Sequence, residues 1–286
     1  MERKIVHVVG TGTIGEPLIG LLCDYENKLG IDEVTFHKNS ALKNDRSKVF
    51  DLIERGARLA VDNGKENEFK KIGMDPDLEK EEAIKRASVI IDCTPKGVGR
   101  ENKLDYYEKF SDDVKGFLAQ GSEDGFGKKY ARGINDAALN SKDQFIQIVS
   151  CNTHNMACIT KTLALNDNPD NLIEGNYVCI RRANDISQPE NFIPSPQVGN
   201  HPNEKYGTHH AADAADLFST LGMDLNLFSS AMKVNSQYMH VMRFNLKLKE
   251  STTLNEIKDK LYNNDHIAMT TKDLTSTVFS FGRDHG

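Results

Sequence analysis

The first half of the chain alternates short apolar runs with segments of helical periodicity. Runs of strand length lie near residues 4–9, 33–37, 57–61, 87–92, 114–119 and 145–149, and helical spacing follows several of them. This alternation predicts an α/β fold with a doubly wound, mostly parallel sheet. Residues 63–80 are rich in Lys, Glu and Gly, so we expect a polar surface excursion there.

The pattern changes after residue 150. Met156, Ile159, Thr160 and Leu163 fall on one helical face, and Asn152 or Thr153 can cap that helix. Residues 175–182 have strand character, and residues 236–248 alternate apolar side chains with polar ones, which places His240 on the apolar face of a strand. We therefore expect a second, α+β domain with a largely antiparallel sheet.

A glycine motif follows the first apolar run. Gly10, Gly12 and Gly15 form a complete G-x-G-x-x-G between a predicted strand and a predicted helix. The first glycine permits a tight turn, the second lets a pyrophosphate approach the backbone, and the third allows close packing of helix on strand. The context predicts a dinucleotide-binding (Rossmann) domain over residues 1–150, with residues 151–286 as the catalytic or substrate domain.

The second strand is expected to end near the adenine ribose, where NAD-binding proteins usually carry an acid. Here the chain has His37, Lys38, Asn39 and Ser40 instead. A lysine at this place accommodates a 2′-phosphate, which predicts that NADP is used at least as well as NAD. Two alternatives stay open, since Lys38 can be a solvated loop residue and an acid on another strand end can replace the missing one.

Cys151 lies where a strand passes into a helix. Unpaired amide groups at a helix N-terminus stabilise a thiolate, which is the nucleophilic form of cysteine. The competing interpretation is a buried structural cysteine. A nucleophilic thiol also needs a base within reach, and His240 is the candidate, although a satisfied core histidine is the usual outcome for such a position.

Two neighbouring histidines, His209 and His210, precede a second helical run. Together with the helix N-terminus they are placed to hold phosphate. A metal site is the rival hypothesis, with His201 and Asp213 as the nearby ligands, and two plain surface histidines are the simplest one. We predict no metal.

Composition narrows the class of protein. The chain has 286 residues, 38% hydrophobic and 27% charged, with a formal net charge of −6, which argues against a dedicated nucleic-acid binder. Five cysteines without a Cys-x-x-Cys pair suggest neither a disulfide framework nor a zinc ribbon. We find neither a signal peptide nor an apolar run of membrane-spanning length, so we expect a cytoplasmic protein without a membrane partner.

Taken together, these motifs resemble glyceraldehyde-3-phosphate dehydrogenase of the archaeal type (class II). The resemblance covers nearly the whole chain and rests on segments in the family's order: 10–15 (GTGTIG), 92–99 (DCTPKGVG), 120–121 (QG), 150–153 (SCNT), 181–183 (RRA), 208–210 (THH) and 239–241 (MHV). It implies phosphorylating oxidation of glyceraldehyde 3-phosphate with NAD or NADP and inorganic phosphate to 1,3-bisphosphoglycerate, or the reverse, in glycolysis or gluconeogenesis. It also implies a homotetramer.

The resemblance further implies roles for individual residues. Cys151 is the expected nucleophile that forms a thioester, and His240 the expected base. The expected contacts of the substrate and phosphate are Ser150, Asn152, Thr153, Arg181, Arg182, His209 and His210. The expected cofactor contacts, together with the glycines Gly10, Gly12 and Gly15, are Thr13, Ile14, Lys38, Thr94, Pro95 and Gly121.

The chain also departs from the family. His154 and Asn155 replace a pair of small residues and put a second possible base beside the nucleophile, whereas Met242 replaces a second histidine. Family members continue beyond residue 286, so the catalytic domain is expected to be incomplete at its C-terminus. Two alternatives stay open: an acyl-phosphate reductase similar to aspartate-semialdehyde dehydrogenase, and a truncated, non-catalytic dinucleotide-binding subunit.

Overall fold

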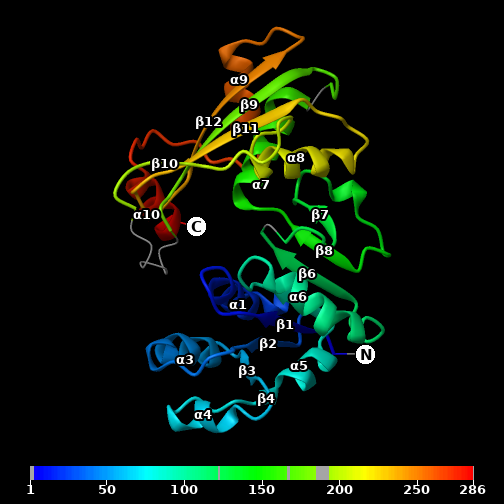
Figure 1. Ribbon diagram of the computed structural model, residues 1–286, viewed down its shortest axis with the longest axis vertical. Helices are drawn as coiled ribbons and strands as arrows, with labels where there is room; N and C mark the ends of the chain where they lie inside the picture. Colours follow the sequence, from blue (N-terminus) through cyan, green and yellow to red (C-terminus); the bar gives the residue numbers. More distant parts are fainter. Residues whose placement is uncertain (1–2, 122, 166–167, 185–192, 286) are drawn as a thin grey trace. The chain divides into compact units, whose positions relative to one another are not determined.

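A computed structural model describes residues 3–121, 123–165, 168–184 and 193–285 of the chain, with side chains described up to residue 282. The chain divides into two compact units (Figure 1). Unit 1 comprises residues 1–128 and 141–148, and unit 2 comprises residues 129–140 and 149–286. The excursion of residues 129–140 into unit 2 has no counterpart in the sequence pattern.

An eight-stranded sheet organises unit 1, in the order β4-β3-β2-β1-β5-β6-β8-β7. The pairings among its first seven strands are all parallel. The strands are β1 Ile5–Val9, β2 Glu33–His37, β3 Arg58–Val61, β4 Leu78–Glu79, β5 Val89–Asp92, β6 Gly116–Gln120, β7 Lys128–Tyr130 and β8 Phe145–Ile148.

The helices of unit 1 follow its strands in sequence, as in a doubly wound fold. They are α1 Gly15–Asp24, α2 Glu26–Leu29, α3 Arg46–Glu54, α4 Glu66–Lys71, α5 Lys80–Arg86 and α6 Val98–Asp105, with 3-10 turns at Lys43–Asp45 and Tyr107–Phe110. One apolar cluster packs β1, β2 and β3 against α1 and α3, and a second surrounds β5 and β6. These buried strands explain why the sequence shows continuous apolar runs there.

The prediction of a polar surface excursion over residues 63–80 is wrong. This stretch contains α4 and the edge strand β4, and Phe69 and Met74 are fully buried in the cluster under β2 and β3. Two apolar side chains five residues apart among lysines and glutamates form no periodic pattern. For this reason the packing was not visible in the sequence.

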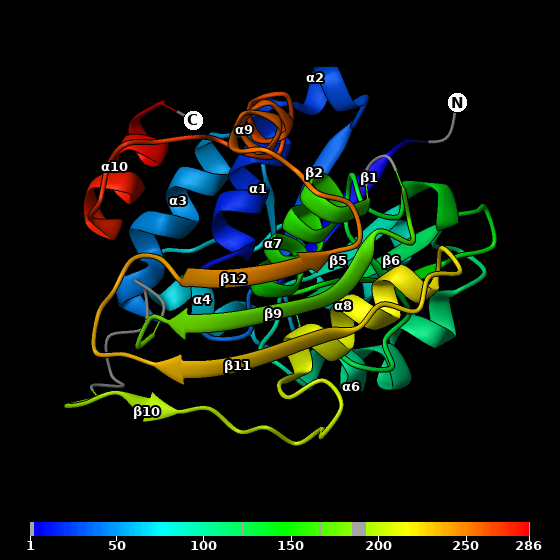
Figure 2. The same cartoon turned by 90° about the horizontal axis from the view of Figure 1, so that it is seen from above.

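Unit 2 contains a four-stranded sheet in the order β10-β11-β9-β12 (Figure 2). Its strands are β9 Leu172–Arg181, β10 Gln197–Val198, β11 Leu227–Lys233 and β12 Val241–Leu248. The β10–β11 and β9–β12 pairings are antiparallel, whereas β11 and β9 are parallel. The predicted fold class, a doubly wound parallel sheet followed by an α+β domain with a largely antiparallel sheet, is confirmed.

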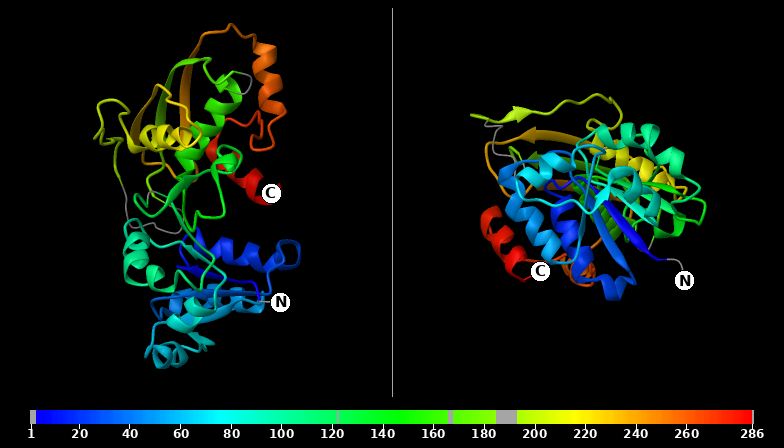
Figure 3. Two further views of the ribbon diagram at one scale, coloured as in Figure 1. Left: turned by 90° about the vertical axis from the view of Figure 1, so that its right-hand side faces the viewer. Right: turned by 90° about the horizontal axis from the view of Figure 1, so that it is seen from below.

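The helices of unit 2 complete its core. They are α7 Cys151–Thr160, a π-helical turn Lys161–Leu165, α8 His209–Ser219, α9 Leu254–Tyr262 and α10 Thr275–His285, and a 3-10 turn lies at Asp136–Ala138. α7 packs on β9 and α8 on β11, and their apolar side chains form one cluster centred on Met156, Tyr177 and Phe218. The C-terminal helices α9 and α10 are drawn in orange and red (Figure 3).

Candidate functional site

The glycine motif of unit 1 forms a tight turn between β1 and α1. Gly10 has φ +97°, a conformation that favours glycine, and a Cβ at Gly15 would lie 1.9 Å from the carbonyl oxygen of Gly10. A Cβ at Gly12, in contrast, would meet nothing within 4 Å. The turn is therefore closed on its inner side and open at Gly12, as the approach of a pyrophosphate requires.

The other predicted cofactor contacts follow neighbouring strands. Lys38 comes directly after β2, Gly10 after β1, Thr94 and Pro95 after β5, and Gly121 after β6. These four strands are adjacent in the order β2-β1-β5-β6 and run parallel, so their carboxyl ends lie at one edge of the sheet. A dinucleotide binds at this edge in open α/β sheets.

Lys38 is not the solvated loop residue of the simpler hypothesis. Its side chain is only 6% exposed, and its Nζ lies 2.5 Å from a carboxylate oxygen of Asp45. An acid also stands at the end of β3, where Asp62 accepts hydrogen bonds from His37 Nε2 at 3.0 Å and Lys65 Nζ at 2.8 Å. These bonds, that from His37 first, hold the pKa of Asp62 well below its usual range.

Carboxylates anchor the loop after β5. Asp92 accepts hydrogen bonds from the backbone N–H and the hydroxyl of Thr94, and from the Tyr107 hydroxyl at 2.6 Å. Glu123, itself buried, accepts from the backbone N–H of Gly97 at 2.6 Å. The loop that carries Thr94 and Pro95 is thus held at both ends, a feature that the sequence analysis missed.

Cys151 is the first residue of α7 and is exposed to solvent. The helix cap is Ser150, whose Oγ accepts a hydrogen bond from the Thr153 N–H and lies 2.9 Å from Thr153 Oγ1. The expected cap at Asn152 or Thr153 is therefore wrong, because the cap lies at Ser150, two or three residues earlier. Burial raises the pKa of the thiols of Cys93 and Cys179 to about 12 and about 11, so these stay protonated at neutral pH.

His210 is buried inside a hydrogen-bonded chain. Its Nε2 lies 3.4 Å from Asn152 Nδ2, and its Nδ1 lies 3.0 Å from Thr208 Oγ1, which lies 2.6 Å from Ser229 Oγ. Because the Asn152 amide nitrogen donates to Nε2, the proton of the neutral ring belongs on Nδ1. Burial, then the charges of His209, Arg181 and His240, lower the pKa of His210 to about 3, so this ring is neutral and cannot attract an anion as a cation.

His240 lies one residue before β12 rather than inside a strand. Its Nδ1 accepts a hydrogen bond of 3.1 Å from the backbone N–H of Arg182. A backbone N–H can only donate, so the neutral ring carries its proton on Nε2. This tautomer is the opposite of that of His210.

Several of the predicted substrate-site residues of unit 2 act electrostatically on two buried groups, Cys179 and His210. Cys151 and Arg181 both perturb the pKa of Cys179, and Arg181, His209 and His240 perturb that of His210. Asn152 joins the group through its contact with His210. Thr153 is fully buried and serves the helix cap, whereas Arg181 is exposed and His209 half-buried.

His154, the second possible base, is hydrogen-bonded away from the nucleophile. Its Nε2 lies 3.0 Å from the carbonyl oxygen of Arg132, which can only accept, so Nε2 carries a proton in this contact. His154 therefore helps to hold the segment 129–140 against α7.

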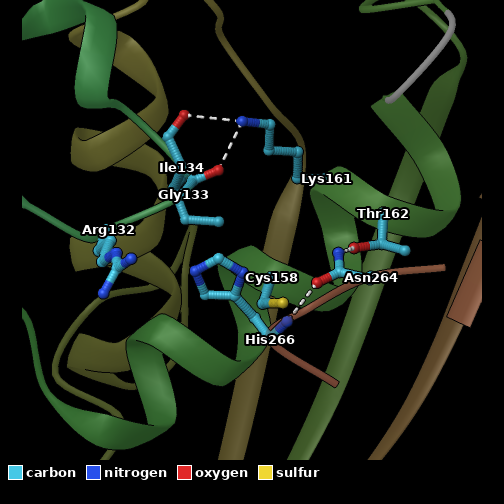
Figure 4. Close-up of a pocket in the computed structure, with 8 residues that line it drawn as sticks. All are labelled: Arg132, Gly133, Ile134, Cys158, Lys161, Thr162, Asn264 and His266. Atoms are coloured by element: carbon cyan, nitrogen blue, oxygen red, sulfur yellow. Dashed lines mark hydrogen bonds between the residues drawn. The ribbon is translucent and has the colours of Figure 1, made fainter. Parts of the chain in front are cut away.

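A cavity of about 220 Å³ lies beside the far end of α7 (Figure 4). Lys161 points to the carbonyl oxygens of Gly133 and Ile134, at 2.6 and 3.1 Å, and His266 lies beside Cys158. None of the predicted site residues lines it. Within the described residues no group of His, Cys, Asp or Glu could hold a metal ion, and no helix is long and apolar enough to cross a membrane.

Comparisons with known proteins place this geometry in context. The chain is 31% identical over 219 residues to glyceraldehyde-3-phosphate dehydrogenase of Methanobacterium formicicum, a match that covers 72% of the chain and 60% of the relative. It is 27% identical over 288 residues to glyceraldehyde-3-phosphate dehydrogenase 2 of Methanosarcina acetivorans, which covers 97% of the chain and 77% of the relative. These matches support an assignment to the glyceraldehyde-3-phosphate dehydrogenase type. No family model matches it.

Other relatives of the same type agree. Glyceraldehyde-3-phosphate dehydrogenase of Methanobacterium bryantii is 28% identical over 248 residues, covering 80% of the chain and 69% of the relative. With a parallel sheet and an open glycine turn, a protein of this type is expected to bind a nicotinamide dinucleotide, and the residues at the strand ends fit such a group.

Several residues that support the candidate site were not predicted from the sequence. Asp45 and Asp62 pair with Lys38 and His37, and Glu123 fixes the loop after β5. Asp62 could have been found, because it directly follows a predicted strand. The burial of His210 could also have been predicted from the sequence, because His210, Ala214 and Leu217 share a helical face with spacing i, i+4, i+7.

Proposed function

We propose that the protein is a phosphorylating glyceraldehyde-3-phosphate dehydrogenase. It would oxidise glyceraldehyde 3-phosphate with NAD or NADP and inorganic phosphate to 1,3-bisphosphoglycerate, or catalyse the reverse. The observation that carries the proposal is the exposed Cys151 at the N-terminus of α7, followed by Asn152, which contacts His210 beside the ring of His209. The names of its relatives support the same activity.

The proposed mechanism begins at the thiolate of Cys151. It attacks the aldehyde carbon and forms a hemithioacetal, and backbone N–H groups at the start of α7 stabilise the developing charge on oxygen. A bound nicotinamide dinucleotide supplies the hydride acceptor for the oxidation that follows. Phosphate then attacks the resulting thioester, so that an acyl phosphate leaves and the Cys151 thiolate is restored.

His240 is the proposed group for proton transfer at the hydroxyl of the hemithioacetal. With its Nδ1 bonded to the Arg182 amide, the neutral ring donates at Nε2 and can hold an oxyanion by a hydrogen bond. To accept the hydroxyl proton at Nε2, the ring has to carry its own proton on Nδ1. The Arg182 hydrogen bond must open for that step.

Anion recognition is proposed for the cations around this thiol. Arg181 is exposed and Arg182 and His209 are half-buried, so these three are the candidates for the substrate phosphate and inorganic phosphate. His210 is neutral, and its proposed role is to orient Asn152. Asn152 and the other two residues around the nucleophile, Ser150 and Thr153, stay proposed substrate contacts. Lys38 is proposed to favour NADP, and a homotetramer in the cytoplasm stays a prediction.

The test measures NADPH formation by the purified chain with glyceraldehyde 3-phosphate, with and without phosphate, with NAD in parallel. Phosphate-dependent turnover that Cys151→Ser abolishes without loss of dinucleotide binding is the expected result. Cys158→Ser, a buried position on the same helix, is the matched control and should keep turnover. Turnover of an amino-acid semialdehyde instead would favour the reductase alternative, and binding without any turnover the non-catalytic one.

A further inference from the structure

The segment before His240 contains a strained turn. Tyr238 has φ +79°, and among the described residues it is the only non-glycine residue with positive φ. The Met239 N–H donates to the Gln237 carbonyl at 3.2 Å, which closes a three-residue γ-turn around Tyr238. This form of γ-turn is rare and strained, and a bulky residue at its centre adds to the strain. Strain of this kind persists only where surrounding contacts enforce it.

Hydrogen bonds tie this segment to the end of β9. The Val234 N–H donates to the Arg181 carbonyl, and the Ala183 N–H donates to the Ser236 carbonyl, both at 2.9 Å. Gln237 Nε2 donates to Asn184 Oδ1. These bonds fix the segment before the turn, and the bond from Arg182 to His240 fixes the residue that follows it.

The C-terminal helix holds the turn itself. The ring of Tyr238 lies against that of Phe279 in α10, with the centroids 5.3 Å apart and the planes at 48°. Such aromatic pairs add to stability beyond their buried area. Relaxation of Tyr238 to an ordinary backbone conformation would swing its ring away from Phe279. The ring contact therefore opposes the relaxation that the strain favours.

We propose that Tyr238 and Phe279 are positioning residues for His240. The contact with α10 keeps the γ-turn closed, and the turn fixes the direction from which the backbone delivers the imidazole, two residues later, to the region of Cys151. This proposal rests on the proposed function only in taking His240 as the partner of the Cys151 thiol. It assigns to α10, through the ring of Phe279, a part in proton transfer.

The test follows alkylation of Cys151 by iodoacetamide as a function of pH, measured on the Cys151 peptide by mass spectrometry. A hydrogen bond from the Nε2–H of the neutral His240 ring would stabilise a nearby thiolate, so His240→Asn should move the profile to higher pH. Phe279→Ala and Tyr238→Ala, which remove one ring and keep the strained backbone, should move it in the same direction, whereas Tyr238→Phe, which keeps the ring, should leave the wild-type profile unchanged. Phe281→Ala is the control, because this ring of α10 is contacted by Lys272, which precedes the helix, whereas the ring of Tyr238 contacts Phe279.

Turnover provides the second readout. Loss of positioning should lower kcat by as much as about 10²-fold in Phe279→Ala, with dinucleotide affinity unchanged. If the contact with α10 is merely structural, Phe279→Ala would lower the melting temperature and leave the alkylation profile unchanged. That result overturns the proposal. So does a profile that His240→Asn fails to move. If the wild type shows no turnover but the profiles shift as expected, the positioning stands and the proposed reaction fails.

Discussion

The backbone N–H of Arg182 donates a hydrogen bond of 3.1 Å to Nδ1 of His240. Arg182 directly follows β9 and His240 directly precedes β12, so the antiparallel pairing of these two strands brings the amide and the ring together. The bond selects one tautomer of the imidazole. A single main-chain contact therefore decides whether Nε2 of His240 is a donor or an acceptor.

This contact predicts opposite tautomers for two histidines of unit 2. In protein labelled with ¹⁵N at histidine, above the pH range of imidazole titration, the His240 signals should show a proton on Nε2 and those of His210 a proton on Nδ1. His240→Asn and His210→Asn identify the signals. The same tautomer in both rings would contradict the hydrogen-bond assignments.

The pair of Lys38 and Asp45 predicts how the cofactor preference can be changed. Lys38→Ala should weaken NADP binding about tenfold, or about 1.4 kcal/mol, because it removes the cation at the end of β2. NAD lacks the 2′-phosphate and should be affected much less. Asp45→Asn should strengthen NADP binding, since it frees the Lys38 ammonium from its counter-ion. Titration of both dinucleotides by fluorescence measures the effect.

The control is Lys70→Ala, which removes an exposed lysine paired with Asp75. It should leave both affinities unchanged. Equal weakening of NAD and NADP by Lys38→Ala would show that Lys38 supports the fold of this edge of the sheet instead of selecting the phosphate.

The sequence predicted the strands and the glycine turn of unit 1 well, because such local structures depend on residues that are neighbours in the chain. The second strand occupies the expected residues 33–37, and the glycine motif lies between β1 and α1 as expected. The start of β12 was predicted five residues too early. The alternation of residues 236–248 runs through Tyr238, where no glycine or asparagine signals the turn.

The contacts of the candidate site were harder to predict because they depend on packing between distant segments. Lys38 sits seven residues before Asp45, and His210 meets Asn152 across 58 residues. A sequence shows that these groups are polar but not which partner each one finds. The same limit applied to Arg182 and His240, whose pairing depends on the register of β9 and β12.

A buried histidine of unit 1 predicts acid sensitivity. His7 is fully buried on β1, with Nδ1 2.7 Å from Thr35 Oγ1 and no hydrogen-bond partner for Nε2. Burial, followed by the charges of His37 and Lys80, lowers its pKa from 6.5 to about 3. Between pH 6.5 and about pH 3, His7 is protonated in the unfolded chain but neutral in the folded chain. The free energy of unfolding therefore decreases as pH falls, by up to about 1.4 kcal/mol per pH unit.

Urea unfolding from pH 7 to pH 4 tests this prediction. His7→Asn cannot titrate, so the free energy of unfolding should depend less steeply on pH below 6.5 than in the wild type. His201→Asn changes an exposed histidine and should keep the wild-type slope. Identical slopes for all three proteins would mean that His7 is not neutral in the folded state.

Two glycines of the β1–α1 turn predict opposite consequences of the same substitution. At Gly15 a methyl group would overlap the Gly10 carbonyl oxygen, 1.9 Å from its ideal position, so Gly15→Ala should lower the free energy of unfolding by about 1–3 kcal/mol or more. At Gly12 the methyl group meets nothing within 4 Å, so Gly12→Ala should leave stability unchanged or slightly raised.

Dinucleotide binding should be weakened in Gly12→Ala, the variant whose stability is unchanged. The open space at Gly12 is where a pyrophosphate approaches the backbone, so its methyl group should weaken NADPH binding by about tenfold or more in a protein that is fully folded. Thermal melting and fluorescence titration on the same samples provide both quantities. If Gly12→Ala binds NADPH as tightly as the wild type, the pyrophosphate does not lie on this turn, and the cofactor site must be sought elsewhere along the carboxyl ends of the strands.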